Sequence, residues 1–212
     1  MYRSFRESTF PSDKVYNRVV EFANASLTWT RNQVSLNSGT QDYWTIVGYV
    51  LAQFDAMLLG YNREARANWQ LEDVDLFLLN MIGDLDDLIP AMQRAIKIEE
   101  GEPTPAYSIS PEEMRDHELR SHCSAIVRFT QSDLFVAHEM WASYLQMYNV
   151  FKHYHFNLNL PAVRSRRVSF ASYPGFLSSE DDFYMTEQQL VVMETTNNVY
   201  NMSLYDRLTP KS

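Results

Sequence analysis

The sequence predicts an α+β fold, with a helical amino-terminal half and a β-rich carboxyl-terminal half. Through residues 1–98, apolar side chains recur every three or four positions, the period of a helix packed on one side. After residue 123, apolar and polar residues alternate, which is typical of strands. A stretch rich in proline and glutamate separates the two patterns. We therefore expect a helical segment at 1–98, an exposed linker at 99–122 and a β-containing segment at 123–212.

The helices are predicted from apolar spacing. Val15–Leu27 follows the helical period, and so does Tyr43–Tyr61, whose apolar side is expected to carry Tyr43, Val47, Val50, Phe54, Met57 and Tyr61. The same period continues from Leu76 to Leu79 and from Leu85 to Ile96. Gly83 and Asp84 predict a break and a new helix cap between these two segments, while Pro90 leaves the boundary open.

The linker is predicted from Glu99 to Ser121, where Pro103, Pro105 and Pro111 interrupt any regular pattern. Within it, Ser110 and Glu113 form a capping box for one short helix.

Strands are predicted on the carboxyl-terminal side of Cys123. Alternation from Ser124 to Phe129, a turn at Gln131–Asp133 and a second apolar run from Leu134 to Ala137 predict a β-hairpin. Helical spacing returns from Trp141 to Phe151, and His153–His155 is interpreted as its polar end. Three further strands are expected at Arg167–Ser172, Asp182–Thr186 and Leu190–Thr196.

Composition excludes several function classes. A net charge of -9 and a pI near 5.0 argue against a nucleic-acid partner, and the short basic cluster Arg164, Arg166, Arg167 is interpreted as a solvated loop. One cysteine permits no internal disulfide, and no ligand spacing predicts a metal or cofactor. Met1–Phe10 lacks a signal-peptide core, and no transmembrane segment is expected. Asn24 and Asn201 begin glycosylation sequons, which matter only in a secreted chain.

Cys123 is the residue with the clearest potential chemistry. It lies where the linker meets the first strand, so cleavage of the His122–Cys123 bond would place a thiol beside a free α-amine. An α-amine has a pKa of about 7.7–8.0 and can serve as the base that activates the thiol. His138, at the end of the second hairpin strand, could lie near it. The alternatives are a cysteine packed as a small core hydrophobe and a structural histidine.

An acidic cluster, Asp84, Asp86 and Asp87, could suggest a metal site. Placement of Asp84 at a helix cap and of Asp87 in the first turn, both favoured by the helix dipole, explains it without metal.

An ordered set of short motifs resembles the phospholipase B-like family. The motifs are Gly83–Leu88, His122–Ala125, Leu134–His138 with Trp141, Lys152–Tyr154, Ser172–Gly175, Asp181–Tyr184 and Glu194–Thr196. The resemblance runs from about Phe22 to about Leu204 and covers only a middle portion of the family's usual length, so we expect an internal portion of a longer protein.

The resemblance implies an N-terminal-nucleophile hydrolase with an αββα sandwich, of which this chain would hold part. It implies cleavage before Cys123, the nucleophile, and association of the two fragments afterwards. It places His138 and Trp141 beside the pocket and Thr196 at an oxyanion or substrate contact. It also implies a lysosomal or secreted protein. Glu139-Met140 departs from the family's frequent Asp-Thr at the pocket rim, and further site residues would lie beyond Ser212.

The function implied is release of acyl chains from phospholipid esters. An amidase acting on N-acyl amide bonds remains open, because the same nucleophile cleaves both bonds. A non-catalytic scaffold that binds lipid or protein, with Cys123 buried, is the third reading.

Overall fold

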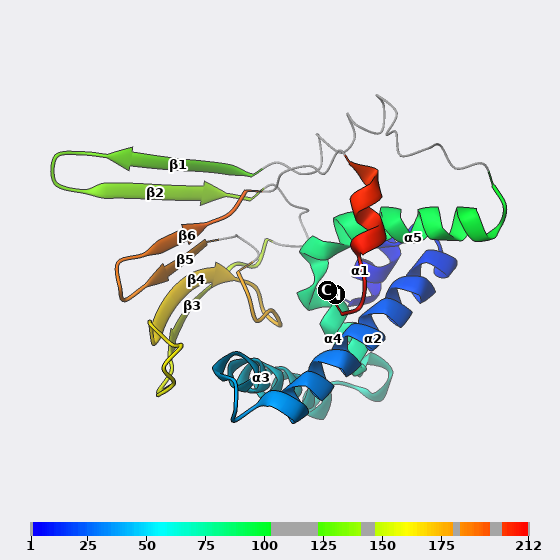
Figure 1. Cartoon of the computed structure of the whole chain (residues 1–212), viewed down its shortest axis with the longest axis horizontal. Coiled ribbons are helices and arrows are strands. Elements are labelled where there is room, and N and C mark those ends of the chain that lie inside the picture. The colour runs from blue at the N-terminus through cyan, green and yellow to red at the C-terminus, as the bar shows by residue number, and fades with distance from the viewer. Residues whose placement is uncertain (1, 103–122, 141–146, 180–182, 196–200, 212) are drawn as a thin grey trace. The chain divides into compact units, whose positions relative to one another are not determined.

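The computed structural model describes residues 2–102, 123–140, 147–179, 183–195 and 201–211. Helices occupy the chain up to Glu99 and strands follow Cys123 (Figure 1), which confirms the predicted α+β class. The described chain forms two compact units. Residues 2–102 and 201–211 make up the helical unit, and the remaining described residues make up the β unit.

The helical unit contains α-helices and short 3-10 helices. Their bounds are α1 Tyr2–Thr9, α2 Asp13–Asn37, α3 Asp42–Glu64, η1 Ala67–Trp69, α4 Asp73–Asn80, η2 Ile82–Asp84, α5 Leu85–Glu99 and η4 Met202–Arg207. No described helix is both long enough and apolar enough to cross a bilayer.

Helix α2 is the centre of this unit and contacts α3, α4 and α5. Ser12 caps its start by accepting a hydrogen bond from the Val15 backbone at 3.3 Å. Its buried side chains, Val15, Val19, Ala23 and Leu27, are spaced by four, so they form one stripe along the helix. Trp29 meets Trp44 of α3 edge-on, with ring centres 5.7 Å apart.

The buried face of α3 differs from the predicted one. Tyr43 is 65% exposed and Tyr61 45% exposed, whereas Phe54 and Leu58 are buried. A Cβ added at Gly48 would lie 3.1 Å from Val34 Cγ1 of α2, so the helices approach closely there. Helix α3 therefore turns Gly48, Phe54 and Leu58 inward, because only a small residue fits at the contact with α2, and two tyrosines of the predicted stripe are left outside.

The acidic segment before α5 is only partly as predicted. Asp84 occupies the N-cap position, yet its backbone is already helical and its side chain makes no capping bond to the described residues. Asp87 lies in the first turn of α5, as predicted, and also accepts a hydrogen bond of 2.7 Å from the Tyr205 hydroxyl, which ties η4 to α5. Helix α5 runs through Pro90 and loses one backbone bond there.

The first residues of the predicted linker are anchored to the helical unit. Glu99 ends α5 and pairs with Arg18 of α2, while Glu100 pairs with Lys14. The rest of the linker, including Ser110 and Glu113 of the predicted capping box, lies outside the described residues.

The β unit contains a hairpin and a four-stranded antiparallel sheet (Figure 1). The hairpin joins β1 Ser124–Phe129 to β2 Leu134–Glu139. The sheet has the order β3-β4-β5-β6, with bounds Val150–His155, Arg167–Ser172, Phe183–Thr186 and Val191–Met193. The hairpin and the strands predicted near β4, β5 and β6 are confirmed.

The predicted helix over Trp141–Phe151 is wrong where the structure describes it. Phe151 lies in β3, and His153–His155 continue that strand, so they do not form a polar helix end. The strand forms because it pairs along its length with β4, with Phe151 opposite Ala171 and His153 opposite Ser169. Residues 141–146 lie outside the described chain.

The sheet's core gathers on one face of β4. Phe170 is 2% exposed, and its ring centre lies 5.2 Å from that of Tyr154 and 5.0 Å from that of Tyr184. Ser172 and Ser179 are buried as well. Their hydroxyls donate to the carbonyls of Ser178 at 2.5 Å and Ala171 at 2.7 Å, which satisfies polar groups that burial would otherwise leave unpaired.

Candidate active site at the start of the first hairpin

The hairpin that follows Cys123 has a regular register. Ser124 lies opposite Glu139, Ala125 opposite His138, and Phe129 opposite Leu134. Thr130 and Asp133 close the turn, with Thr130 donating its N–H to the Asp133 carbonyl at 2.8 Å and accepting the Asp133 N–H on its hydroxyl at 2.9 Å. The start of β1 and the end of β2 therefore lie together.

This register puts Cys123 and His138 on one face of the hairpin. Side chains two positions apart in a strand share a face, and Cys123 is two residues before Ala125, the partner of His138. Diagonal neighbours of this kind are typically about 7–8 Å apart, within reach of a long or ring-bearing side chain. Cys123 is half-buried and its thiol is free of any disulfide. The observed pairing supports the expected proximity of the two residues.

His138 is half-buried, and both of its ring nitrogens are shielded from solvent. Its Nδ1 and Nε2 are the buried side-chain atoms that find no hydrogen-bond partner among the described residues. Buried polar groups are nearly always paired, and an unpaired one is often found at a site that binds or reacts. A ring that can donate through one nitrogen and accept through the other therefore shares a face of the hairpin with the candidate nucleophile.

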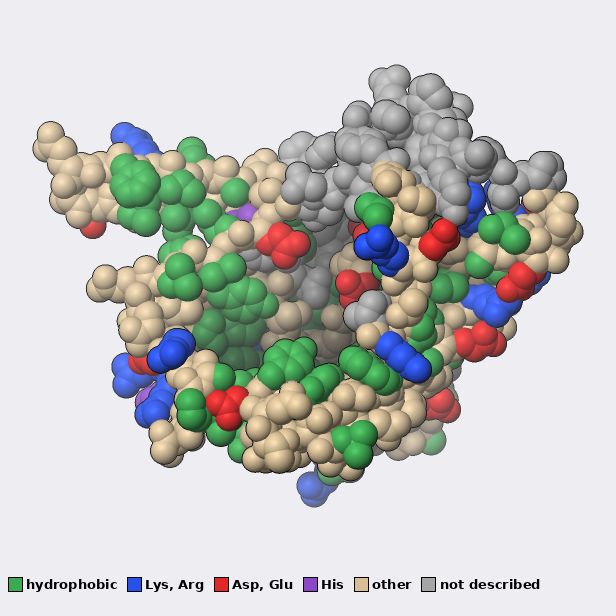
Figure 2. Space-filling view, in the orientation of Figure 1, with side chains coloured by type: hydrophobic (Ala, Val, Ile, Leu, Met, Phe, Trp, Pro, Cys, Tyr) green, Lys and Arg blue, Asp and Glu red, His purple; other side chains and the backbone are tan. Residues whose placement is uncertain are grey.

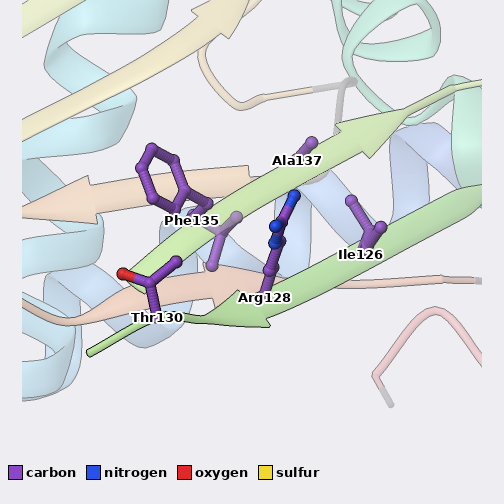
Figure 3. A pocket seen from close by; sticks show the side chains of 6 residues that line it. Ile126, Arg128, Thr130, Phe135 and Ala137 are labelled. Carbon is purple, nitrogen blue, oxygen red and sulfur yellow. The ribbon is translucent and has the colours of Figure 1, made fainter. Parts of the chain in front are cut away.

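A shallow hollow of about 550 Å³ lies on the hairpin, but on the opposite face (Figure 3). Ile126 lies opposite Ala137 and Arg128 opposite Phe135, so these side chains point away from the face of His138. Hydrophobic side chains cover the hairpin in Figure 2, and Phe129 is 79% exposed. Val136, which also lines the hollow, lies on the face of His138, but neither Cys123 nor His138 is among the lining residues.

Other predicted site residues fall outside the described chain. These are His122, Trp141 and Thr196, so their roles stay predictions. In the described ranges, no group of three or more His, Cys, Asp or Glu side chains is placed to hold a metal ion.

The two sequon asparagines are both exposed. Asn24 lies within α2, whereas acceptor sequons are usually found in surface loops. Asn201 uses its side-chain oxygen to cap η4, accepting from the Ser203 N–H at 3.1 Å and the Ser203 hydroxyl at 2.7 Å. Glycosylation at either residue stays a prediction.

Two polar features of the sheet escaped the sequence analysis. His153 Nδ1 lies 2.6 Å from Ser169 Oγ, across the β3–β4 pair. Lys152, on the other face, donates its Nζ to the Phe176 carbonyl, and burial lowers the pKa of its ammonium group. A strand could have been predicted here from the alternation of side chains, in which Lys152 and Tyr154 lie on one face and His153 and His155 on the other.

Comparison with known proteins gives the family. The sequence profile of the Phospholipase B family matches residues 1–212. The chain belongs to the phospholipase B family. It is 33% identical to phospholipase B-like 1 of Rattus norvegicus over 203 residues, which is 93% of this chain. It is also 33% identical to phospholipase B of Crotalus adamanteus, over 93% of this chain, and to phospholipase B-like protein G of Dictyostelium discoideum, over 100%.

The chain is much shorter than these relatives. It covers 34% of the rat protein, 35% of the Crotalus protein and 37% of the Dictyostelium protein. The chain therefore spans about a third of the length of these phospholipase B relatives, as the expected internal portion would.

Proposed function

We propose that this chain is a segment of a hydrolase that releases acyl chains from phospholipid esters, with Cys123 as an N-terminal nucleophile. Family membership supports phospholipid esters as the substrate class, because the relatives carry phospholipase B in their names. The single structural observation that carries the nucleophile assignment is the register that brings Cys123 onto one face with His138, whose ring nitrogens find no hydrogen-bond partner in the described part of the chain.

The proposed maturation step is cleavage of the His122–Cys123 bond. The Cys123 thiol attacks the His122 carbonyl, the acyl group moves from nitrogen to sulfur, and water hydrolyses the resulting thioester. The products are a carboxylate on His122 and a free α-amine on Cys123. One residue then holds both the nucleophile and its base.

In turnover, the α-amine takes the thiol proton and the thiolate attacks the ester carbonyl. The tetrahedral intermediate collapses, the alcohol leaves with the proton held on the amine, and the acyl group remains on sulfur as a thioester. Water then attacks, giving its proton to the amine, and the fatty acid leaves as the thiol is restored. An α-amine pKa of about 7.7–8.0 suits both proton transfers near neutral pH.

The remaining parts of the proposal follow the family resemblance. His138 and Trp141 line the pocket, and Thr196 contacts the oxyanion or the substrate. The complete protein adopts an αββα sandwich in which the two cleavage fragments stay associated, and it is lysosomal or secreted. The chain needs no cofactor or metal in this mechanism, since thiol and amine supply the chemistry.

A paired assay tests the proposal and separates it from its rivals. The chain, expressed with the sequence that flanks it in its gene, is given a diacyl phospholipid and an N-acyl amine in parallel. Fatty-acid release from the phospholipid that disappears in Cys123→Ala supports the esterase. Faster cleavage of the amide would make it an amidase, and equal background with both substrates in native and Cys123→Ala protein would leave a non-catalytic scaffold.

A further inference from the structure

A second polar site lies at one end of the β3–β6 sheet, within the β unit. Its lining comes from separate segments: His155 ends β3, Arg164 and Arg166 lie in the loop before β4, Arg167 begins β4, and Glu187 and Gln188 follow β5. These residues, with Val163, surround a hollow of about 470 Å³. The sequence analysis interpreted the arginines as a solvated loop, but the fold gathers them around one concavity.

Backbone pairing holds the segments in place. His155 lies opposite Arg167 in the β3–β4 pair, and the Glu187 N–H donates to the Arg167 carbonyl at 3.2 Å. The Glu187 carboxylate accepts the Arg166 N–H at 2.7 Å, so it joins the loop before β4 to the turn after β5. Gln189 in that turn has a φ of 59°, a left-handed conformation that the surrounding bonds must impose.

The charges around the hollow are predominantly positive. Three arginines against one glutamate leave a net charge of +2 in the lining when His155 is neutral, in a chain whose net charge is -9. Figure 2 shows Lys and Arg side chains gathered beside a histidine and a carboxylate at this end of the sheet. A hollow lined by an excess of positive charge attracts small anions, even when the net charge of the whole protein is negative.

Of the arginines around the hollow, Arg167 forms an ion pair with a carboxylate of the described chain. Arg167 pairs with Glu187, its Nε lying 3.7 Å from Oε2. Arg166 donates to the Asn159 side-chain oxygen at 3.2 Å, and within the described ranges neither it nor Arg164 forms an ion pair. Two guanidinium groups therefore remain able to receive an external anion.

The donor set favours one ligand chemistry. A guanidinium offers a planar fork of N–H donors that matches two oxygens of a phosphate group, and a phosphate has enough oxygens to satisfy two such forks at once. The hydrogen bond from the Arg166 N–H, with a smaller effect of Arg167, keeps the pKa of Glu187 below its usual range. The carboxylate therefore remains charged and weakens the attraction of the arginines for an anion.

We propose that the hollow lined by His155, Arg164, Arg166, Arg167 and Glu187 binds a phosphate group. The group can belong to a phospholipid headgroup or to free phosphate, which present the same oxygens. The hollow shares no lining residue with the proposed active site, and its binding does not depend on the proposed hydrolysis, so the two proposals can fail independently.

The experiment measures binding by the whole chain in two arms. Isothermal titration with inorganic phosphate forms one arm, and co-sedimentation with phosphatidylcholine vesicles, with and without phosphatidic acid, forms the other. The test variant is Arg164→Gln with Arg166→Gln. The matched control is Arg63→Gln with Arg66→Gln, which removes the same charge from exposed arginines of the helical unit. Thermal unfolding checks that each variant folds.

The pocket variant should bind about 25-fold more weakly, because each arginine near an anionic group contributes roughly a fivefold gain in affinity. The control should bind like the native chain, and Cys123→Ala should as well. Vesicle binding that inorganic phosphate displaces would identify the headgroup as the source, whereas phosphate binding without vesicle binding would identify free phosphate. Either result supports the site.

Two results would overturn the proposal. The first is an absence of binding in both arms. An equal loss of affinity in the pocket and control variants would count the same way, because it would show that binding depends on the net charge of the chain and not on this hollow. The second concerns Glu187→Gln, which keeps an oxygen for the Arg166 N–H and removes the opposing charge. This variant should bind several-fold more tightly, and weaker binding by a folded Glu187→Gln chain would contradict the charge balance described here.

Discussion

Arg31 joins three helices of the helical unit, and its removal is the most informative test of that packing. From α2, its Nη1 donates to Asp55 Oδ2 at 3.0 Å and its Nη2 to Asp55 Oδ1 at 2.6 Å, a two-pronged contact with α3. Its Nη2 also donates to Asp73 Oδ2 at 3.2 Å, at the start of α4. We expect Arg31→Met, which keeps most of the apolar stem, to lower the free energy of unfolding.

The magnitude follows from geometry and exposure. The Arg31 side chain is 35% exposed and its partners Asp55 and Asp73 are 49% and 56% exposed, so solvent screens the pair substantially. Exposed ion pairs contribute about 0.2–1 kcal/mol each, and two-pronged arginine contacts lie at the upper end of that range. The expected loss is therefore about 1 kcal/mol at neutral pH.

The pH dependence gives a sharper signature. The hydrogen bonds from Arg31 hold the pKa of Asp55 below its usual range. Because the folded-state pKa is depressed, the stabilisation is present above the unfolded-state pKa of about 3.9 and is lost as pH falls through the lower folded-state pKa. The difference between native chain and Arg31→Met should thus stay constant from neutral pH to about pH 5 and shrink in more acidic solution.

Urea unfolding followed by tryptophan fluorescence measures this loss, since Trp29, Trp44 and Trp69 all lie in the helical unit. Arg63→Met is the control, because the Arg63 side chain is 83% exposed and, within the described ranges, its ion pair is with the adjacent Glu64, at 3.9 Å. A loss no larger than the control's, or one that does not change with acidification, would refute the assignment of stability to this cluster.

Further predictions concern the helix contact and the sheet. Gly60→Ala, with open space around the new Cβ, should raise stability by about 0.5–1 kcal/mol, while Gly48→Ala should gain less because its Cβ would lie 3.1 Å from Val34. Equal gains in urea unfolding would disprove close packing at Gly48. Ser179→Ala removes the donor to the Ala171 carbonyl and should cost about 1–3 kcal/mol. Faster hydrogen exchange in β4 is the readout, with exposed Ser132→Ala as control, and unchanged exchange would count against that bond.

Elements could be predicted from the sequence where their apolar pattern is compatible with only one type of secondary structure. Alternation from Ser124 to Phe129 and again from Leu134 favours strands over a helix, so the hairpin could be anticipated, and with it the shared face of Cys123 and His138. The segment ending at Phe151 was misread because its aromatic residues fit helical spacing, while the partner strand β4 begins well after it in sequence. Pairing with a distant segment then overrides the local pattern.

Features made by several segments could not be predicted in the same way. The hollow proposed to bind phosphate is lined by His155, by arginines at 164–167 and by Glu187. These segments are distant in sequence and come together through the order of strands in the sheet. The inward face of α3 likewise depends on Gly48 meeting α2, a contact that apolar spacing cannot reveal. In both cases the missing information was the position of a neighbouring element.

The most direct test of the central claim is identification of the amino ends of the mature protein by mass spectrometry. The chain is expressed with its flanking sequence, incubated in mild acid and compared with Cys123→Ala. We expect a new amino end that reads Cys-Ser-Ala-Ile in the native protein and none in the variant. A protein that hydrolyses phospholipid while the His122–Cys123 bond stays intact, or a Cys123→Ala variant that is still cleaved there, would contradict the assignment of Cys123 as nucleophile.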